Sequence, residues 1–174
     1  MKKKLFSLGL LLLAVSSFAT AVDGYKGVKF GSNFNELKAA KMCSWKKLKD
    51  DVKGMSAYYC DDFKFIGEKS KASAFFINEK FERFAVVLGE NTDVIFDSLL
   101  KKYGLPSFMP TDEEMKRYEL LGGEMNFKFD NDTVIVLFIL DVAKKIVETE
   151  LIYTSTKFDA LYKELRQKSL ENDI

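Results

Sequence analysis

The sequence of 174 residues contains no histidine. This absence excludes Ser-His and Cys-His nucleophilic catalysis, histidine metal ligands and the side chain that most often transfers protons near neutral pH. The sequence also lacks the two glycine-rich patterns that bind nucleotide phosphates, G-x-x-x-x-G-K-S/T and G-x-G-x-x-G. We therefore expect that the protein is not an enzyme and that it carries no cofactor.

Paired carboxylates are the hydrolytic arrangement that remains open. The compact candidates are Asp61 with Asp62 and Asp130 with Asp132. Both pairs lie at predicted strand ends or turns, where aspartate is common because its side chain bonds the nearby backbone. A calcium site at 130–132 would lack the distal bidentate glutamate of a calcium loop. A carboxylate hydrolase is therefore the weakest alternative, and no metal site is expected.

The longest apolar run lies at the N-terminus. Lys2, Lys3 and Lys4 precede a mostly apolar stretch at 5–18, and Ala19-Thr20-Ala21 follows it with small residues. This pattern predicts a signal peptide at 1–21, cleaved after Ala21, and a periplasmic location. The run is shorter than the roughly 20 residues of a membrane span, so we expect no stable membrane insertion after cleavage. An uncleaved anchor is the alternative.

The charge balance is nearly even, with 27 basic and 26 acidic residues. Three of the basic residues lie in the predicted signal peptide, so the rest of the chain has a slight acidic excess. No large basic field is left to attract nucleic acid, and we expect no nucleic-acid partner. The 16 phenylalanines and seven tyrosines predict an aromatic-rich core in a single domain at 22–174.

Cysteine occurs twice, at Cys43 and Cys60, and both positions lie in the exported part. In an oxidising compartment an isolated pair of this kind predicts one disulfide. A redox-active pair is the alternative, but the two cysteines of such pairs usually stand two residues apart at a helix start. We therefore expect a structural disulfide.

The hydrophobic periodicity predicts an α+β fold. Helices are expected at 33–41, at 92–103, in a short segment capped by Thr111, and from Thr156 to a tail that frays after Arg166. Strands are expected at 25–30, 62–67, 72–77, 81–88, 124–129, 133–140 and 146–153, with a turn at 68–71.

The order of these elements is the same in the two halves of the chain. Helix 33–41 and its strands correspond to helix 92–103 and its strands, at an offset of about 63 residues. The sequence thus predicts tandem α-β-β-β units, with pseudo-repeats at 25–90 and 91–168. They would form a mostly antiparallel sheet with helices packed on one face. Chance similarity between the halves is the alternative.

The predicted strand 134–140 is apolar on both faces. An antiparallel sheet with helices on one side should be half polar on the other, so something is expected to cover the second face. The covers left open are the C-terminal helix, the connector 107–121, a second copy of the chain, or a partner. The same pattern supports an alternative function, a carrier of a small apolar ligand.

Short phrases of the sequence carry a resemblance to known families. Gly27-Val28-Lys29-Phe30-Gly31 leads into a helix, and Leu99-Leu100-Lys101-Lys102-Tyr103-Gly104-Leu105-Pro106 ends another. With the tandem order, the chain resembles the β-lactamase-inhibitor-protein-like fold and, at the level of one unit, the SmpA/OmlA-type outer-membrane assembly lipoproteins. It departs from them in lacking a lipid-accepting cysteine and in having a cysteine pair in the first half only. The resemblance implies a protein that acts by binding other proteins.

Five aromatic or methionine side chains are the candidate partner-binding residues. Trp45, Tyr58 and Tyr59 lie in or beside the segment that the disulfide closes, and Phe108 and Met109 lie on the connector. Such side chains are the usual centres of protein interfaces; the alternative is that they pack beneath their own loops. The leading hypothesis is a soluble periplasmic protein-binding module, an inhibitor or immunity-type protein, with an envelope protein as partner. The oligomeric state is left open.

Overall fold

The computed structural model describes residues 21–49, 52–89, 92–144 and 146–173. The predicted signal peptide therefore lies outside the described residues except for Ala21. The elements follow in the order β1 (Gly24–Tyr25), β2 (Val28–Lys29), α1 (Phe34–Ala39), β3 (Lys46–Lys47), β4 (Met55–Phe65), β5 (Glu68–Ile77), β6 (Lys80–Leu88), α2 (Thr92–Tyr103), α3 (Asp112–Leu121), β7 (Gly123–Phe129), β8 (Val134–Asp141), β9 (Ile146–Thr154) and α4 (Phe158–Asp173).

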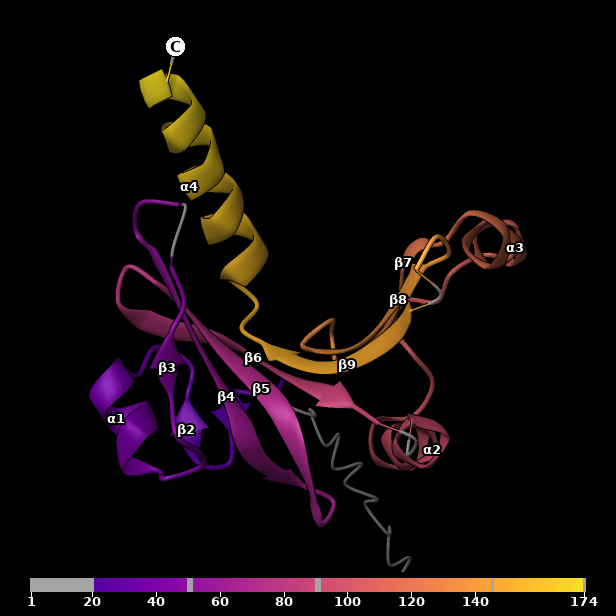
Figure 1. Ribbon diagram of the computed structural model, residues 1–174, viewed down its shortest axis with the longest axis horizontal. Coiled ribbons are helices and arrows are strands. Elements are labelled where there is room, and N and C mark those ends of the chain that lie inside the picture. The colour runs from indigo at the N-terminus through magenta and orange to yellow at the C-terminus, as the bar shows by residue number, and fades with distance from the viewer. Residues whose placement is uncertain (1–20, 50–51, 90–91, 145, 174) are drawn as a thin grey trace, which may run out of the picture.

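Seven strands form one antiparallel sheet in the order β3-β4-β5-β6-β9-β8-β7, and β1 pairs with β2 in a separate hairpin (Figure 1). The first half of the chain contributes the short edge strand β3 and the consecutive strands β4, β5 and β6, and the second half contributes β7, β8 and β9. The halves meet where β6 pairs with β9. The predicted α+β class, the antiparallel sheet and the helix-strand-strand-strand order are confirmed. Descent of the two halves from one duplicated unit stays a prediction.

Two-residue turns set the register of the first half. Ile66–Gly67 and Asn78–Glu79 all have positive φ, between 48° and 83°, as the hairpin turns that match strand twist require. The turn predicted at 68–71 was placed too late, because its polar residues belong to the exposed start of β5. The strand predicted at 25–30 is likewise divided by a turn at Lys26–Gly27, where φ is 46° and 84°.

The first face of the sheet carries the main core, under α1 and α2. Leu37 of α1 is fully buried, and Ile95 and Leu99 of α2 are 5% exposed. Phe96 of α2 makes edge-to-face contacts with Phe127 and Phe129. The other large side chains of this core are Phe63, Phe76, Phe81, Phe84, Val86, Val134, Val136 and Leu151. The helix predicted at 92–103 is confirmed, and Gly104 ends it with a φ of 80°.

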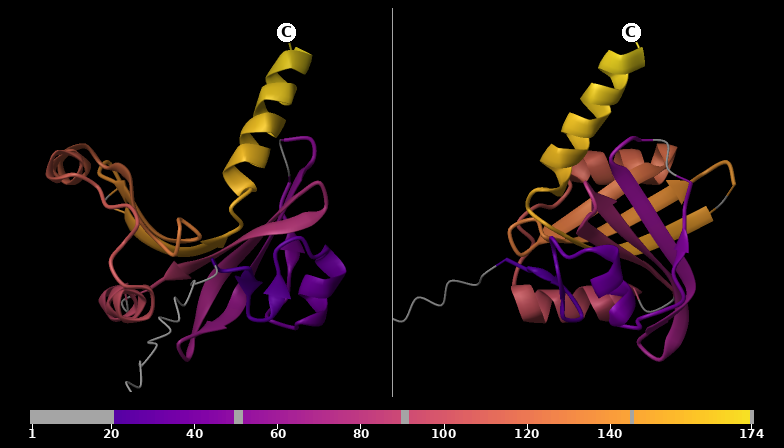
Figure 2. Two further views of the ribbon diagram at one scale, coloured as in Figure 1. Left: turned by 180° about the vertical axis from the view of Figure 1, so that it is seen from behind. Right: turned by 90° about the vertical axis from the view of Figure 1, so that its left-hand side faces the viewer.

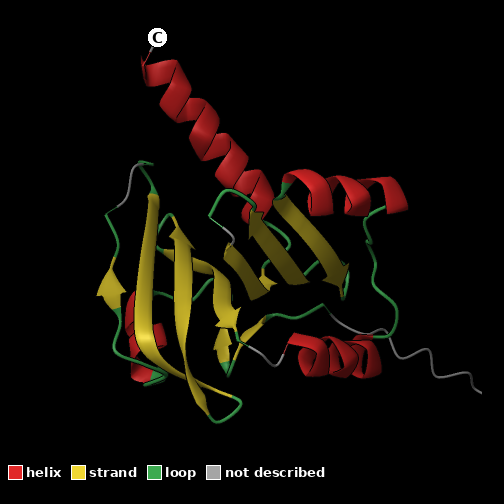
Figure 3. Cartoon of the chain, turned by 45° about the vertical axis from the view of Figure 1, so that its right-hand side comes forward, coloured by secondary structure: helices red, strands yellow, loops and turns green. Residues whose placement is uncertain are grey.

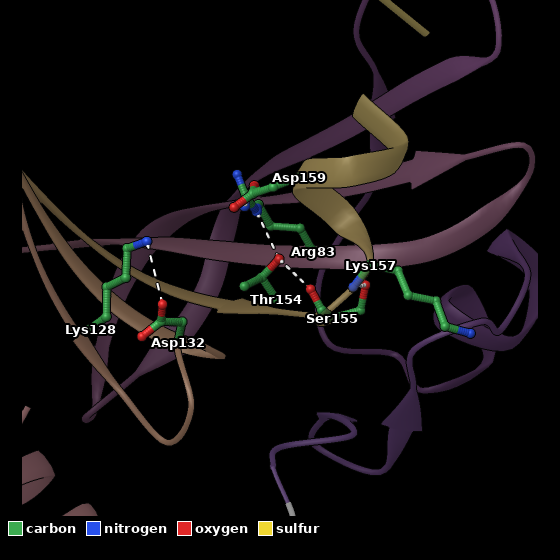
Figure 4. A network of polar contacts seen from close by, with 7 residues as sticks. All are labelled: Arg83, Lys128, Asp132, Thr154, Ser155, Lys157 and Asp159. Atoms are coloured by element: carbon green, nitrogen blue, oxygen red, sulfur yellow. Dashed lines mark hydrogen bonds and ion pairs between the residues drawn. The ribbon is translucent and has the colours of Figure 1, made fainter. Parts of the chain in front are cut away.

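The second face is covered at one end by α4. Phe158 packs edge-to-face on Phe75 of β5, with ring centroids 6.4 Å apart, and the Arg83 guanidinium lies 3.6 Å from the Phe158 ring centroid. Arg83 also donates hydrogen bonds to Asp159 Oδ1 at 2.8 Å and to Thr154 Oγ1 at 3.1 Å (Figure 4). These contacts fix the first turn of α4 to β6 and β9.

The prediction about the placement of the helices is confirmed only in part. The prediction that the helices pack on one face holds for α1 and α2 and is wrong for α4, which lies on the opposite face. The C-terminal helix was one of the covers of the second face that the sequence left open. The tail predicted to fray after Arg166 instead continues α4 to Asp173, and this part of the helix projects past the sheet (Figure 1).

The predicted disulfide between Cys43 and Cys60 is present. Cys60 lies on β4 and is fully buried, so the bond ties the segment after α1 to the second strand of the sheet. The chain between the two residues then has fewer conformations available when the protein unfolds.

We expect that replacing both cysteines, Cys43→Ser with Cys60→Ser, lowers the free energy of unfolding by about 3 kcal/mol, because a loop with a sequence separation of 17 is no longer closed in the unfolded chain. Guanidinium denaturation of the oxidised protein and the variant measures the difference, and reduced wild-type protein is the control. Equal denaturation midpoints for all three samples would contradict a stabilising role.

The attachment of α4 gives a second prediction. Phe158→Ala removes a ring that is 4% exposed and lies between Phe75 and Arg83, so we expect a loss of about 3 kcal/mol in unfolding free energy and faster proteolysis within α4. Leu170→Ala on the projecting part of the same helix, 57% exposed, is the matched control and should change stability by less than about 0.5 kcal/mol. Equal effects of the two substitutions would show that α4 is not held by Phe158.

Candidate functional site

Beyond α4, the second face of the sheet continues over β6, β9 and β8 toward β7. The helices α4 and α3 stand at its two ends, and between them no helix of the described chain lies over this face (Figure 1, Figure 2). The half-buried residues here are Val87, Leu137, Ile139, Glu148 and Glu150, which we call the open face. Glu150 lies opposite both Val87 and Leu137, and Glu148 lies opposite Ile139.

A small apolar cluster lies beside the open face. Ala85, Ile135 and Ile152 from three adjacent strands are buried there, and Phe75 and Leu137 pack against them. Val134, Val136 and Phe138 of the same strand point the other way, into the main core. On the second face, Ile135 is thus packed within the chain, whereas Leu137 and Ile139 stay half-buried on the open face.

Three carboxylates give the open face its electrostatic character. Glu124 of β7 lies opposite Ile139, on the other side from Glu148, and Glu150 follows two residues later on β9. Burial raises the pKa of Glu150, and repulsion from Glu148 and Glu124 raises it further, while Arg83 opposes the change. None of the three glutamates forms an ion pair with another described residue.

The outer edge of β7 forms a second feature at the margin of this face. Phe108 pairs with Lys128 through two backbone hydrogen bonds, so the connector adds a short extended segment to the sheet. The chain then turns at Thr111, where the predicted cap is confirmed, and Thr111 forms with Glu114 a capping box that opens α3. Figure 3 shows α3 beyond the β7 edge, and a hollow of about 280 Å³ lies between them.

Gly122 fixes how closely α3 approaches the sheet. Its φ is 71°, and a Cβ atom at this position would lie 2.4 Å from the backbone oxygen of Leu140. Only glycine fits both the backbone conformation and the distance. Gly122 therefore ends α3 at a point where the chain packs closely against the backbone of β8.

The five predicted partner-binding residues are not brought together. Tyr58 stacks on Phe34 with ring centroids 3.8 Å apart, beneath α1, and Trp45 packs edge-to-face against Phe84 of the main core. Tyr59 is half-buried on the second face of β4, where the Lys46 ammonium lies 5.5 Å from its ring centroid. Packing within the chain thus accounts for Trp45 and Tyr58.

Phe108 and Met109 lie at the opposite margin of the sheet, beside β7, and are 43% and 56% exposed. The Lys128 ammonium lies 5.6 Å from the Phe108 ring centroid. Of the five candidates, these two stand next to the open face, and they remain candidates for partner contact.

The paired carboxylates have structural contacts. Asp62 accepts hydrogen bonds from the backbone and hydroxyl of Ser44, which lower the pKa of Asp62, and Asp61 forms an ion pair with Lys46. Asp132 accepts a hydrogen bond from the Ser107 hydroxyl at 2.7 Å. These contacts connect loops to strands and give the carboxylates a role that requires no substrate.

The three glutamates of the second face were missed in the sequence. Their proximity arises from the pairing of β7, β8 and β9, and the pairing of separate strands is a tertiary property. A local signal existed, because Glu148 and Glu150 stand two residues apart in a predicted strand and so share one face of β9. The sequence did not show that Glu124 faces the same surface.

Among the described residues, no helix has both the length and the apolar character needed to cross a membrane. Comparison with known proteins identifies relatives. Residues 25–173 match a family described as "Uncharacterised protein". An "Uncharacterized protein" of Haemophilus influenzae is 35% identical over 161 residues, which cover 90% of each chain. No solved structure matches.

These matches do not include a β-lactamase-inhibitor-protein-like or SmpA/OmlA family, so that resemblance stays a prediction. The family match includes every strand and helix from Tyr25 to the end of α4, and with it the open face and the β7 edge. Because residues 25–173 match this family, the chain belongs to it.

Proposed function

We propose that the chain is an exported protein-binding module that recognises a positively charged partner through the open face. The observation that carries this proposal is a sheet surface with apolar side chains at its centre and glutamates around them that have no ion-pair partner among the described residues. An apolar centre with a polar rim is the usual composition of a protein interface.

The charges indicate the kind of partner. Glu124, Glu148 and Glu150 repel one another, and a lysine or arginine placed among them would relieve this repulsion. An inhibitor or immunity-type role in the envelope agrees with the protein-binding behaviour that the fold-level resemblance implies. The disulfide is typical of proteins that reside in an oxidising compartment and supports export.

The N-terminal end of the described chain also supports cleavage after Ala21. The Val22 backbone nitrogen donates a hydrogen bond to Asp130 Oδ2 at 2.6 Å, and the Thr133 hydroxyl donates to the same oxygen at 2.9 Å. Cleavage before Val22 would convert this amide into a free ammonium group. The contact with Asp130 would then be a charge-assisted hydrogen bond, which is stronger than the neutral one.

This contact gives a pH-dependent prediction. A chain that begins at Val22 with a free amine should be about 1 kcal/mol more stable than the same chain acetylated there, because acetylation removes the charge. The ion pair requires a protonated amine, whose ordinary pKa is about 8 and which pairing raises. The stability difference should therefore be present at neutral pH and be lost as the pH rises through that raised pKa.

Thermal unfolding of both chains as a function of pH measures the difference. Asp130→Asn in each chain is the control, and it should destabilise the free-amine chain more than the acetylated one. Equal stability of the free-amine and acetylated chains at every pH would contradict an ion pair formed on cleavage.

The open face is tested by reversing its charge. The mature chain should recover a stoichiometric protein partner from envelope extracts, and Glu148→Lys with Glu150→Lys should weaken binding of that purified partner at least about tenfold. Asp97→Lys is the matched control, because Asp97 is exposed on α2, which packs on the first face. Recovery of no partner, or equal binding by both variants, would refute the proposed function.

A further inference from the structure

The backbone of β7 faces outward at three alternate residues. The N–H and C=O groups of Lys128 bond to Phe108 and so point away from β8. In an antiparallel ladder every second residue has the same orientation, and the register of β7 with β8 is unbroken from Gly123 to Phe129. The N–H and C=O groups of Asn126 and Glu124 therefore also point outward, and no described residue bonds to them.

The chain's own edge segment stops before it reaches these groups. With Phe108 opposite Lys128, an antiparallel continuation would place Pro110 opposite Asn126. Proline has no N–H and cannot donate to the ladder, and the chain turns at Thr111 into α3. The next two pairing positions on β7 are thus left open by the covalent structure of the connector.

The hollow between α3 and β7 lies beside these two positions. Its lining includes Tyr118 and Leu121 of α3 and Met125 of β7, together with the charged residues Glu114 and Arg117 of α3. The side-chain oxygen of Asn126 is buried and has no hydrogen-bond partner among the described residues. Exposed edge groups beside a hollow that has apolar side chains in its lining are the features that strand addition by a peptide uses.

We propose that the β7 edge at Glu124–Asn126 binds an extended, basic segment of the partner protein as an additional strand. This inference rests on the proposed function and names the mode of recognition. The segment continues the edge that Phe108 already occupies, and its backbone bonds the outward groups of Asn126 and Glu124. Alternate side chains then point toward α3, where apolar residues contact Tyr118 and Leu121.

Charge determines which side chain of the added strand fits opposite Glu124. A residue paired with Glu124 points to the same face as Glu124 itself, because side chains directly opposite in a sheet lie on one face. Glu148 lies on this face as well, on the far side of Ile139. A lysine or arginine at that position meets two carboxylates, whereas an aspartate or glutamate is repelled.

The experiment selects peptides from a displayed library of random octapeptides on the immobilised mature protein, residues 22–174. The expected peptides alternate apolar residues with lysine or arginine, and their binding slows hydrogen exchange at the Asn126 amide at least about tenfold. Glu124→Pro removes one outward N–H and leaves the hydrogen bonds to β8 in place. It should lower the affinity of the selected peptides for the protein at least about tenfold. Glu124→Thr keeps the N–H and removes the charge, so it should retain binding and lose the preference for basic residues.

The proposal is overturned if no peptide is enriched over a blank support, or if the enriched peptides bind Glu124→Pro as tightly as the wild type. Its failure can be distinguished from failure of the proposed function. If a partner binds the variant with Glu148→Lys and Glu150→Lys more weakly but binds Glu124→Pro normally, the open face remains supported as the binding surface and strand addition is refuted. If peptides bind the β7 edge but the protein recovers no partner from envelope extracts, strand addition is supported and the proposed function is refuted.

Discussion

The pairing of β6 with β9 is the contact on which the rest of the structure depends. It places Val86 opposite Leu151 and Phe84 opposite Tyr153, in the centre of a seven-stranded sheet. A unit of one helix and three strands buries too little apolar surface to be stable alone. By joining two such units side by side, this pairing creates one continuous first face, and α1 and α2 bury their apolar residues in the same core.

The same pairing also creates the second face, which is less completely covered. At one end, Phe158 and Arg83 hold α4 against β5, β6 and β9. Toward β7 the surface has half-buried apolar residues and glutamates without ion pairs among the described residues, beside a sheet edge where Pro110 ends the chain's own pairing. The incomplete cover is a direct result of helix placement, because α3 lies beyond the sheet edge instead of across the strands (Figure 3).

The two surfaces proposed to bind a partner, the open face and the β7 edge, are therefore places where charged side chains or backbone groups have no partner among the described residues. The core is formed by aromatic side chains that contact one another, and it accounts for Tyr58 and Trp45 without a partner. The carboxylates at 61, 62 and 132 are engaged in loop contacts. The open face and the outward backbone groups of Asn126 and Glu124 have no such internal explanation, and a basic polypeptide would satisfy both.

Local sequence determined most elements of this protein. The helix at 92–103, the cap at Thr111 and the strands of the second half depend on neighbouring residues and were predictable, and the isolated cysteine pair predicted the disulfide. The turn at Ile66–Gly67 was misplaced because the charged residues at the start of β5 resemble a turn, and the turn at Lys26–Gly27 was missed because the residues around it alternate as in a strand. Tertiary structure alone decided that α4 covers the second face, that Tyr58 is packed beneath α1, and that Glu124 joins Glu148 and Glu150. Each of these results depends on which strands pair and in what register. That pairing joins residues far apart in the chain, so it is fixed only when the whole sheet is assembled.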